Sequence, residues 1–157
     1  MQHCECVLDC AQLSDNEEIA ALEAISFPPD EAASLATITK RLTEAGRYFY
    51  CYRDLKRSNS LVGFVNGTCI VGNKINHESM TNHEPSGRTL VIHSVTIHPD
   101  FRRKGLGSTM LKVYIQKMRH EPSIDTIVLL SKVHMLSFYT GCGFSIVRAS
   151  DVAHGQV

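Results

Sequence analysis

The sequence has 157 residues, with 16 basic and 16 acidic side chains and a formal net charge of zero when histidine is counted as neutral. This length fits one domain, and 43% hydrophobic with 20% charged residues is ordinary for a soluble globular protein. Zero net charge excludes a general attraction to nucleic acid or anionic lipid. We therefore expect a single domain over residues 1–157, a monomer, with neither of those partners.

The amino-terminal residues and the cysteines indicate location and redox state. No apolar run approaches the ~18 residues of a membrane span and the start does not resemble a signal peptide, so we expect a cytoplasmic protein. Six cysteines lack the density of a disulfide scaffold, which favours reduced thiols. His3, Cys4, Cys6 and Cys10 could supply four soft ligands, but C-x-C-x-x-x-C lacks the paired C-x-x-C spacing of zinc modules. We therefore predict no metal site.

The first part of the chain predicts a short strand and two helices. Residues 6–9 have strand composition. Ser14 is then expected to cap a helix, with Glu17 completing a capping box. The proline pair at 28–29 ends that helix, and residues 30–45 predict a second one.

The middle of the chain predicts most of a sheet. Residues 48–52 and 61–70 read as consecutive antiparallel strands joined by a polar turn. Residues 73–87 form a polar loop. An apolar strand over residues 90–97 is followed by a helix over residues 105–120, in which apolar side chains recur at helical spacing.

The last part predicts two further strands and a short helix. Residues 126–130 read as a buried strand, residues 136–140 begin a short helix, and residues 144–148 read as the next strand. This order, with one right-handed strand–helix–strand crossover at its centre, predicts an α+β three-layer domain with a mixed central sheet flanked by helices.

A basic, glycine-containing turn joins the strand 90–97 to the helix that follows. It reads Arg102-Arg103-Lys104-Gly105-Leu106-Gly107-Ser108. The glycines let backbone N–H groups approach a ligand closely, and an anion bound there would lie at the positive end of the helix. An isolated G-x-G is more often a plain turn, and this turn is neither a phosphate loop with a terminal Gly-Lys-Ser/Thr nor G-x-G-x-x-G.

The turn does match R/Q-x-x-G-x-G/A, the acetyl-CoA signature of the GNAT superfamily of N-acetyltransferases. Other segments follow in that family's order and spacing: SFPPDEAAS (26–34), VGF (62–64), HESM (77–80), IHSVTIHPDFRRKGLG (92–107) and FYTGCGF (138–144). From about residue 13 to 144 the sequence resembles the arylalkylamine N-acetyltransferase branch, the group of serotonin N-acetyltransferase, and most of all its fungal and other non-vertebrate members. The resemblance implies the three-layer GNAT fold, with acetyl-CoA as cosubstrate. It also implies contacts to that cosubstrate from the basic turn and from the backbone of Val95, Thr96 and Ile97.

His93 is the candidate general base. An ammonium titrates near ~10, so a group with a pKa near neutrality must take its proton, and histidine is the usual one. A histidine on a strand is often structural. The resemblance favours catalysis, because vertebrate members carry H-x-H on this strand and His93 matches the second histidine. Val91 occupies the first position, so we expect a water chain ending at His93, with slower deprotonation.

Tyr139 is the candidate general acid for the departing thiolate. Its phenol stays protonated at neutral pH, and the family's catalytic tyrosine falls at this position. The alternative is a plain aromatic anchor before a glycine turn. Ser137 stands where relatives usually have proline. Cys142 could in principle form an acetyl-enzyme, but no neighbouring base is evident, so we expect it to be a packing residue.

The resemblance also implies that Phe27 and Pro28 shape the amine pocket. Asp30 and Glu31 could instead attract a polycation, or simply cap the second helix. The leading prediction is acetyl-CoA-dependent N-acetylation of a small primary amine, such as tryptamine, serotonin or phenethylamine, by direct attack in a ternary complex.

Three alternatives stay open: a polyamine N-acetyltransferase, a catalytically weak acyl-CoA-binding protein, and a protein acetyltransferase on the same fold. Relatives also continue into a final strand, whereas this sequence stops at Val157. Either that strand is absent or the sequence is shortened.

Overall fold

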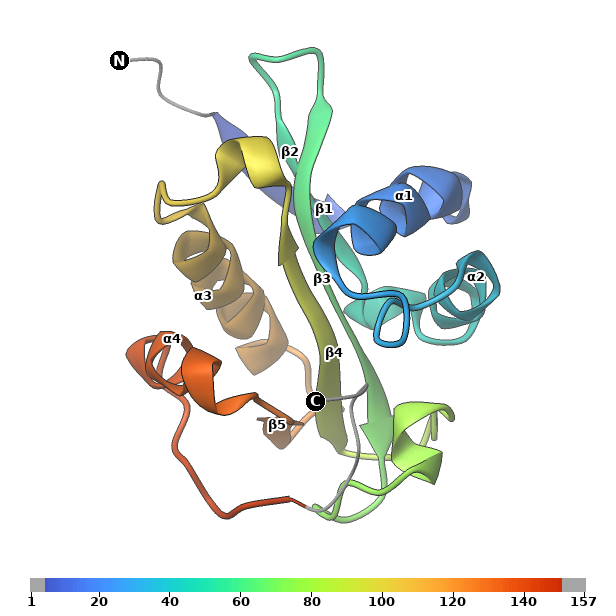
Figure 1. Ribbon diagram of the computed structural model, residues 1–157. Coiled ribbons are helices and arrows are strands. Elements are labelled where there is room, and N and C mark those ends of the chain that lie inside the picture. Colours follow the sequence, from blue (N-terminus) through green and yellow to red (C-terminus); the bar gives the residue numbers. More distant parts are fainter. Residues whose placement is uncertain (1–4, 151–157) are drawn as a thin grey trace.

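A five-stranded sheet forms the centre of the molecule (Figure 1). The computed structural model describes residues 5–150. The strands lie in chain order: β1 (Cys6–Cys10), β2 (Tyr50–Asp54), β3 (Ser60–Ile70), β4 (Thr89–Ile97) and β5 (Thr126–Leu129). Neighbouring strands from β1 to β4 pair antiparallel, and β4 pairs parallel with β5. The sheet is therefore mixed, as predicted.

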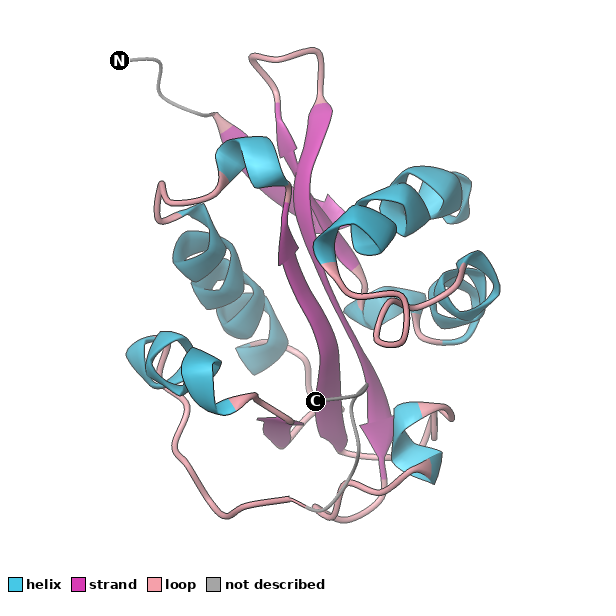
Figure 2. Ribbon diagram, viewed as in Figure 1, coloured by secondary structure: helices cyan, strands magenta, loops and turns pink. Residues whose placement is uncertain are grey.

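Helices cover both faces of this sheet (Figure 2). The helices α1 (Asn16–Ser26) and α2 (Leu35–Glu44) lie on one face, and α3 (Leu106–Arg119) and α4 (Leu136–Gly141) lie on the other. Phe64 and Val65 of β3 belong to different cores, because successive side chains of a strand point to opposite faces. Two apolar cores thus confirm the predicted three-layer α+β fold.

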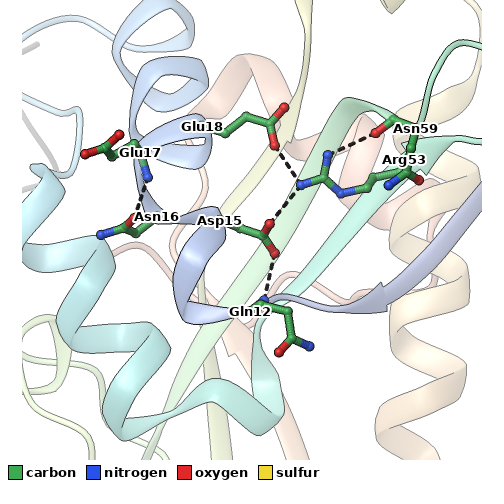
Figure 3. A network of polar contacts seen from close by, with 7 residues as sticks. All are labelled: Gln12, Asp15, Asn16, Glu17, Glu18, Arg53 and Asn59. Atoms are coloured by element: carbon green, nitrogen blue, oxygen red, sulfur yellow. Dashed lines mark hydrogen bonds and ion pairs between the residues drawn. The ribbon is translucent and has the colours of Figure 1, made fainter.

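Arg53 of β2 fixes the start of α1 to the sheet (Figure 3). Its guanidinium donates to Asp15 Oδ1 at 3.1 Å, to Glu18 Oε1 at 2.7 Å and to the Asn59 carbonyl at 3.0 Å. The clamp joins the helix, the sheet and the β2–β3 turn. These contacts fix the position of α1 relative to the sheet that carries the candidate site.

The predicted helix starts on this face were wrong in detail. A short 3-10 helix, η1 (Leu13–Asp15), precedes α1, and its capping box is formed by Gln12 and Asp15 rather than by Ser14 and Glu17. The second helix begins at Leu35 instead of residue 30, because Ser34 Oγ accepts from the Thr37 N–H and provides a better cap. Residues 28–34 form a turned loop instead.

The predicted boundaries of the later strands also change. β2 begins at Tyr50, since Gly46–Tyr48 form a 3-10 helix, η2. The short helix η3 (Glu78–Met80) interrupts the predicted loop 73–87.

The carboxyl end of the sheet differs most from the prediction. β5 was expected to be buried, but it is only half-buried because it is the last strand within residues 5–150. Residues 144–148 were expected to form a strand and do not. None of the strands between residues 5 and 150 pairs with them, and Ile146 and Val147 are 64% and 85% exposed. The end of the sequence, where relatives would add a strand, lies outside the described residues.

The thiol prediction holds only in part. Cys10, Cys51, Cys69 and Cys142 are free, whereas Cys6 is in a disulfide. Within residues 5–150, no group of three or more His, Cys, Asp or Glu side chains could hold a metal ion. The possible ligands His3 and Cys4 lie outside that range. No helix in the same range is long and apolar enough to cross a membrane.

Candidate active site

The fourth strand of the sheet, β4, is irregular at His93. Asn66 of β3 pairs with Ser94, but the next residue, Gly67, pairs with Ile92, so the register skips His93. An extra residue in one strand disturbs the ladder and redirects the neighbouring side chains. As a result His93 and Ser94, which would point to opposite faces of a regular strand, both line one cleft.

The edge of β4 beyond this irregularity is open on the β5 side. β5 pairs only with the stretch from Thr89 to Ile92. Among the described residues, no strand pairs with positions 93–97 on that side. Val95 and Ile97 pack against the core that includes α3, and Thr96 is buried. A ligand lying along this edge would therefore meet the backbone of these three residues.

The basic turn after β4 leads into the amino terminus of α3. Two of its residues take the left-handed conformation: Arg103 at φ 63° and Gly105 at φ 74°. Glycine adopts this conformation without strain, whereas for arginine it costs about 1–2 kcal/mol. Such strain persists only where the surroundings enforce it and is common at ligand sites. Gly105 is the N-cap and has no side chain, so no cap hydrogen bond covers the first turn of the helix.

Gly107 lies in that first turn and is not required by packing. A Cβ there would lie 3.5 Å from Ile97 Cγ1 and 3.6 Å from the Phe138 ring, which is ordinary contact. The helix amino terminus thus presents uncapped N–H groups beside the backbone of Gly107, which no side chain covers. Arg102, Arg103 and Lys104 surround it and are exposed. This is the geometry of an anion site.

One further basic residue, missed in the sequence, lies near the turn. Arg57 from the β2–β3 turn and Lys104 both stack on the Phe101 ring, at 5.4 and 5.7 Å from its centroid. Arg102 is held differently: its Nε donates to the Ile97 carbonyl at 3.0 Å. The basic surface therefore extends from the turn to a hairpin some 45 positions earlier in the chain, which no local motif reveals.

On the face of α1 and α2, a cleft of about 410 Å³ opens beside His93. It is bounded by the end of α1, the loop that follows, α2, the end of η3 with the next residue, and β4. The predicted residues Phe27 and His93 both line it, as do Asp30 and Glu31. Pro28 does not. It is exposed, and its carbonyl accepts from the N–H groups of Glu31 and Ala32 at 2.9 Å, which shapes the loop.

Glu23 is the most buried charged residue of the cleft and was not identified from the sequence. It is 2% exposed, and its Oε1 accepts from Ser94 Oγ at 3.0 Å. Burial raises its pKa. Hydrogen bonds from Ser94 and the Ala33 backbone and the charge of Arg41 oppose this only in part. The sequence did hold a signal, since Glu23 follows Ile19 and Leu22 at i+4 and i+1 and so shares their buried face.

The imidazole of His93 is anchored by a hydroxyl from the neighbouring strand. His93 Nε2 and Thr68 Oγ1 are hydrogen-bonded at 2.7 Å. His93 is partly buried and lines the cleft next to Ser94 and Glu23. A histidine so placed can exchange a proton with a group bound in the cleft.

Tyr139 lies on the other side of the sheet, in α4. Its ring packs edge-on against Phe138 and Phe144, with centroids 5.1 and 5.9 Å apart. Burial, and to a smaller extent the charge of Cys142, raises the pKa of Tyr139, so the phenol is neutral at pH 7 and can donate a proton. It does not line the cleft that holds His93.

Two neighbours of Tyr139 reach the amino terminus of α3. The Cys142 thiol donates to Ser108 Oγ at 3.7 Å, and Phe138 faces Gly107. The predicted residues therefore form two groups, Tyr139 with the basic turn and Phe27 with His93. The edge of β4 from His93 to Ile97 joins them.

The fold and these features identify the class of protein. Residues 14–144 match the family model of the Acetyltransferase (GNAT) family, which is most of the chain, so the chain belongs to this family. Serotonin N-acetyltransferase of Mesocricetus auratus is 32% identical over 97 residues, which are 62% of this chain and 47% of that protein. The enzyme of the same name from Macaca mulatta is 29% identical over 97 residues.

The chain spans about half the length of these curated relatives. Among solved structures, the GphF GNAT-like decarboxylase in complex with isobutyryl-CoA superposes with a TM-score of 0.71 at 25% identity. That comparison covers 86% of this chain and 71% of the other. These similarities confirm the predicted resemblance to the GNAT superfamily and its arylalkylamine N-acetyltransferase group.

Proposed function

We propose that this protein transfers the acetyl group of acetyl-CoA to a small primary amine. The observation that carries the proposal is the course of β4, which runs from a histidine-lined cleft along an open edge to an anion site at a helix terminus. The pyrophosphate would bind at α3, the pantetheine would follow positions 95–97, and the amine would occupy the cleft. Relatives named serotonin N-acetyltransferase and a fold neighbour bound to isobutyryl-CoA support this assignment.

In this proposal the reaction is a direct attack in a ternary complex. His93 takes a proton from the ammonium, directly or through water. The neutral nitrogen then attacks the acetyl carbonyl carbon, the C–N bond forms and the C–S bond breaks. Backbone N–H groups of the open edge of β4 are suited to stabilise the oxyanion. Tyr139 gives its proton to the departing thiolate and is reprotonated from solvent.

For the acceptor, we propose an aromatic amine rather than a polyamine. Phe27 lines the cleft and offers an aromatic contact, whose burial is worth about 1.5–3 kcal/mol for a ring of that size. Of the two carboxylates that could attract a polycation, Glu31 is already paired with Lys132, and Asp30 is exposed. An exposed carboxylate contact contributes only about 0–1 kcal/mol. The aromatic contact is expected to dominate.

The test is thiol release from acetyl-CoA with tryptamine, phenethylamine, spermidine and a short peptide side by side. We expect the highest kcat/KM for the two arylalkylamines and a loss of that preference in Phe27→Ala. If spermidine is preferred at physiological salt and Asp30→Asn with Glu31→Gln removes its advantage, the protein is a polyamine acetyltransferase. Binding of acetyl-CoA without turnover of any amine would indicate an acyl-CoA-binding protein.

A further inference from the structure

The candidate amine cleft is charged on both walls. On one side α2 presents Thr37, Lys40 and Arg41, which lie at i, i+3 and i+4 and so share one helix face. The acidic residues Glu23, Asp30 and Glu31 line the cleft from α1 and from the loop that follows it. An acceptor that is only aromatic and cationic would use one of these walls. The cationic wall has no role in the function proposed so far.

Arg41 is the residue of that wall whose hydrogen-bonding capacity is unused. It is partly buried, yet among residues 5–150 its guanidinium forms no hydrogen bond and no ion pair. Burial lowers the pKa of Arg41 to about 10, and the nearby charge of Glu23 offsets this only in part. A guanidinium has five N–H donors in a planar fork, and those of Arg41 are open to a ligand in the cleft that it lines.

The neighbouring charges already have partners. Glu23 accepts from Ser94 and from the Ala33 backbone. Lys40 Nζ donates to the Thr81 carbonyl at 3.0 Å, and Lys132 pairs with Glu31. Among the described residues, Arg41 is thus the cation of this wall whose guanidinium is not engaged by another side chain or carbonyl. Its planar fork is suited to a carboxylate, which it can bind through two parallel hydrogen bonds.

We propose that the acceptor carries a carboxylate beside its amino group, as an amino acid does, and that Arg41 binds this carboxylate. The inference rests on the proposed N-acetyltransferase function and deepens it. The ammonium faces His93 and the acidic wall, the carboxylate faces α2, and Phe27 favours an aromatic side chain. The amino nitrogen of the amino acid attacks the acetyl carbon, giving an N-acetyl amino acid and the thiol of CoA. A polyamine, by contrast, would place further cations against Arg41 and Lys40.

The test compares acceptors that differ only in the carboxylate. Tryptophan and tryptophanamide have the same ring and an amino group at the same position, but only the first is an anion at that end. We expect kcat/KM of the wild type to favour tryptophan by about 10- to 100-fold, as for a charge-assisted bidentate contact. Arg41→Met should bring the ratio close to one. Lys40→Met is the matched control on the same helix face and should leave the ratio at least severalfold in favour of tryptophan.

A second measurement needs neither a variant nor turnover. Indole-3-propionate has the ring and the carboxylate but no amine, and indole-3-propionamide is its neutral counterpart. Calorimetry on the wild-type protein saturated with CoA should show at least about tenfold tighter binding of the carboxylate. Equal binding of the two, or a tryptophan preference that survives in a folded Arg41→Met protein, overturns the proposal. If none of the amines gives thiol release but the carboxylate still binds more tightly than its amide, the acetyltransferase function is ruled out and the carboxylate site is kept.

Discussion

The two ends of β4 are built in different ways. At the cosubstrate end, the proposed contacts come from backbone: the open edge of the strand, the left-handed turn and the first turn of α3. At the acceptor end, they come from side chains that α1, its loop, α2 and β4 bring to one cleft. The backbone contacts of the first end lie in one continuous segment, 95–108, whereas residues of the second are up to 71 positions apart, as in the Ser94–Glu23 bond. A shared cosubstrate can be recognised by a short motif, but an acceptor is selected by tertiary contacts.

This contrast predicts that one substitution can disable the cosubstrate end completely. Gly107→Val places a branched side chain over the uncapped N–H groups of α3. We expect acetyl-CoA affinity to fall by about 1000-fold, the equivalent of two charge-assisted hydrogen bonds, without loss of fold. Calorimetry measures the affinity and thermal unfolding checks the fold. Gly107→Ala is the control, because a methyl fits beside Ile97 and Phe138. Near-normal affinity in the valine protein would contradict the anion site.

The acceptor end should respond through rate and pH. In His93→Ala we expect kcat/KM for the amine to fall about 100-fold at neutral pH, because the base is lost, while acetyl-CoA affinity stays unchanged. The ratio of wild-type to variant kcat/KM should shrink as pH approaches the pKa of the amine, because the free amine needs no base. The check is a pH–rate profile of variant and wild type. A deficit that is constant over pH would show that His93 is not the base.

Tyr139→Phe should have a smaller effect at the cosubstrate end. A thiol has a pKa near ~8.5, so a thiolate leaves without full protonation, and we expect kcat to fall about 10- to 30-fold. The edge-on contacts with Phe138 and Phe144 remain in the variant. Steady-state kinetics with acetyl-CoA binding measured separately distinguishes the outcomes. A phenylalanine enzyme with full kcat leaves Tyr139 as a packing residue.

The smallest expected effect concerns the stability of the acceptor end. Because burial raises the pKa of Glu23 in the folded protein above 4.5, the folded state holds this proton to higher pH than the unfolded chain. The wild type should therefore lose stability as pH rises from about 4.5 through the folded pKa. Glu23→Gln lacks this titration, so its unfolding free energy relative to wild type should improve over the same range. Urea unfolding at several pH values measures the difference. If the unfolding free energies of wild type and Glu23→Gln change with pH in parallel, the pKa of Glu23 is not raised in the folded protein.

Much of this protein was determined by local sequence. The alternation of apolar residues, the cap and turn residues and the R-x-x-G-x-G turn act within a few positions of one another, so the three-layer fold and the basic turn followed from the sequence. Phe27 and His93 were also named in advance as candidate site residues, through the resemblance of their segments to a known family, and both line the cleft.

Only the tertiary structure decided the rest. The irregularity at His93 depends on pairing with β3, and it is what turns Ser94 into the cleft beside it. Taken from the local sequence, Glu23 and Arg41 are each one charged residue on a helix. Their proposed roles depend on their burial between the layers of the fold. Residues 144–148 have strand composition but no strand, because a strand needs a partner that local propensity cannot supply. Burial and strand pairing are properties of the whole fold, and for that reason the candidate acceptor cleft could not be derived from the order of its residues.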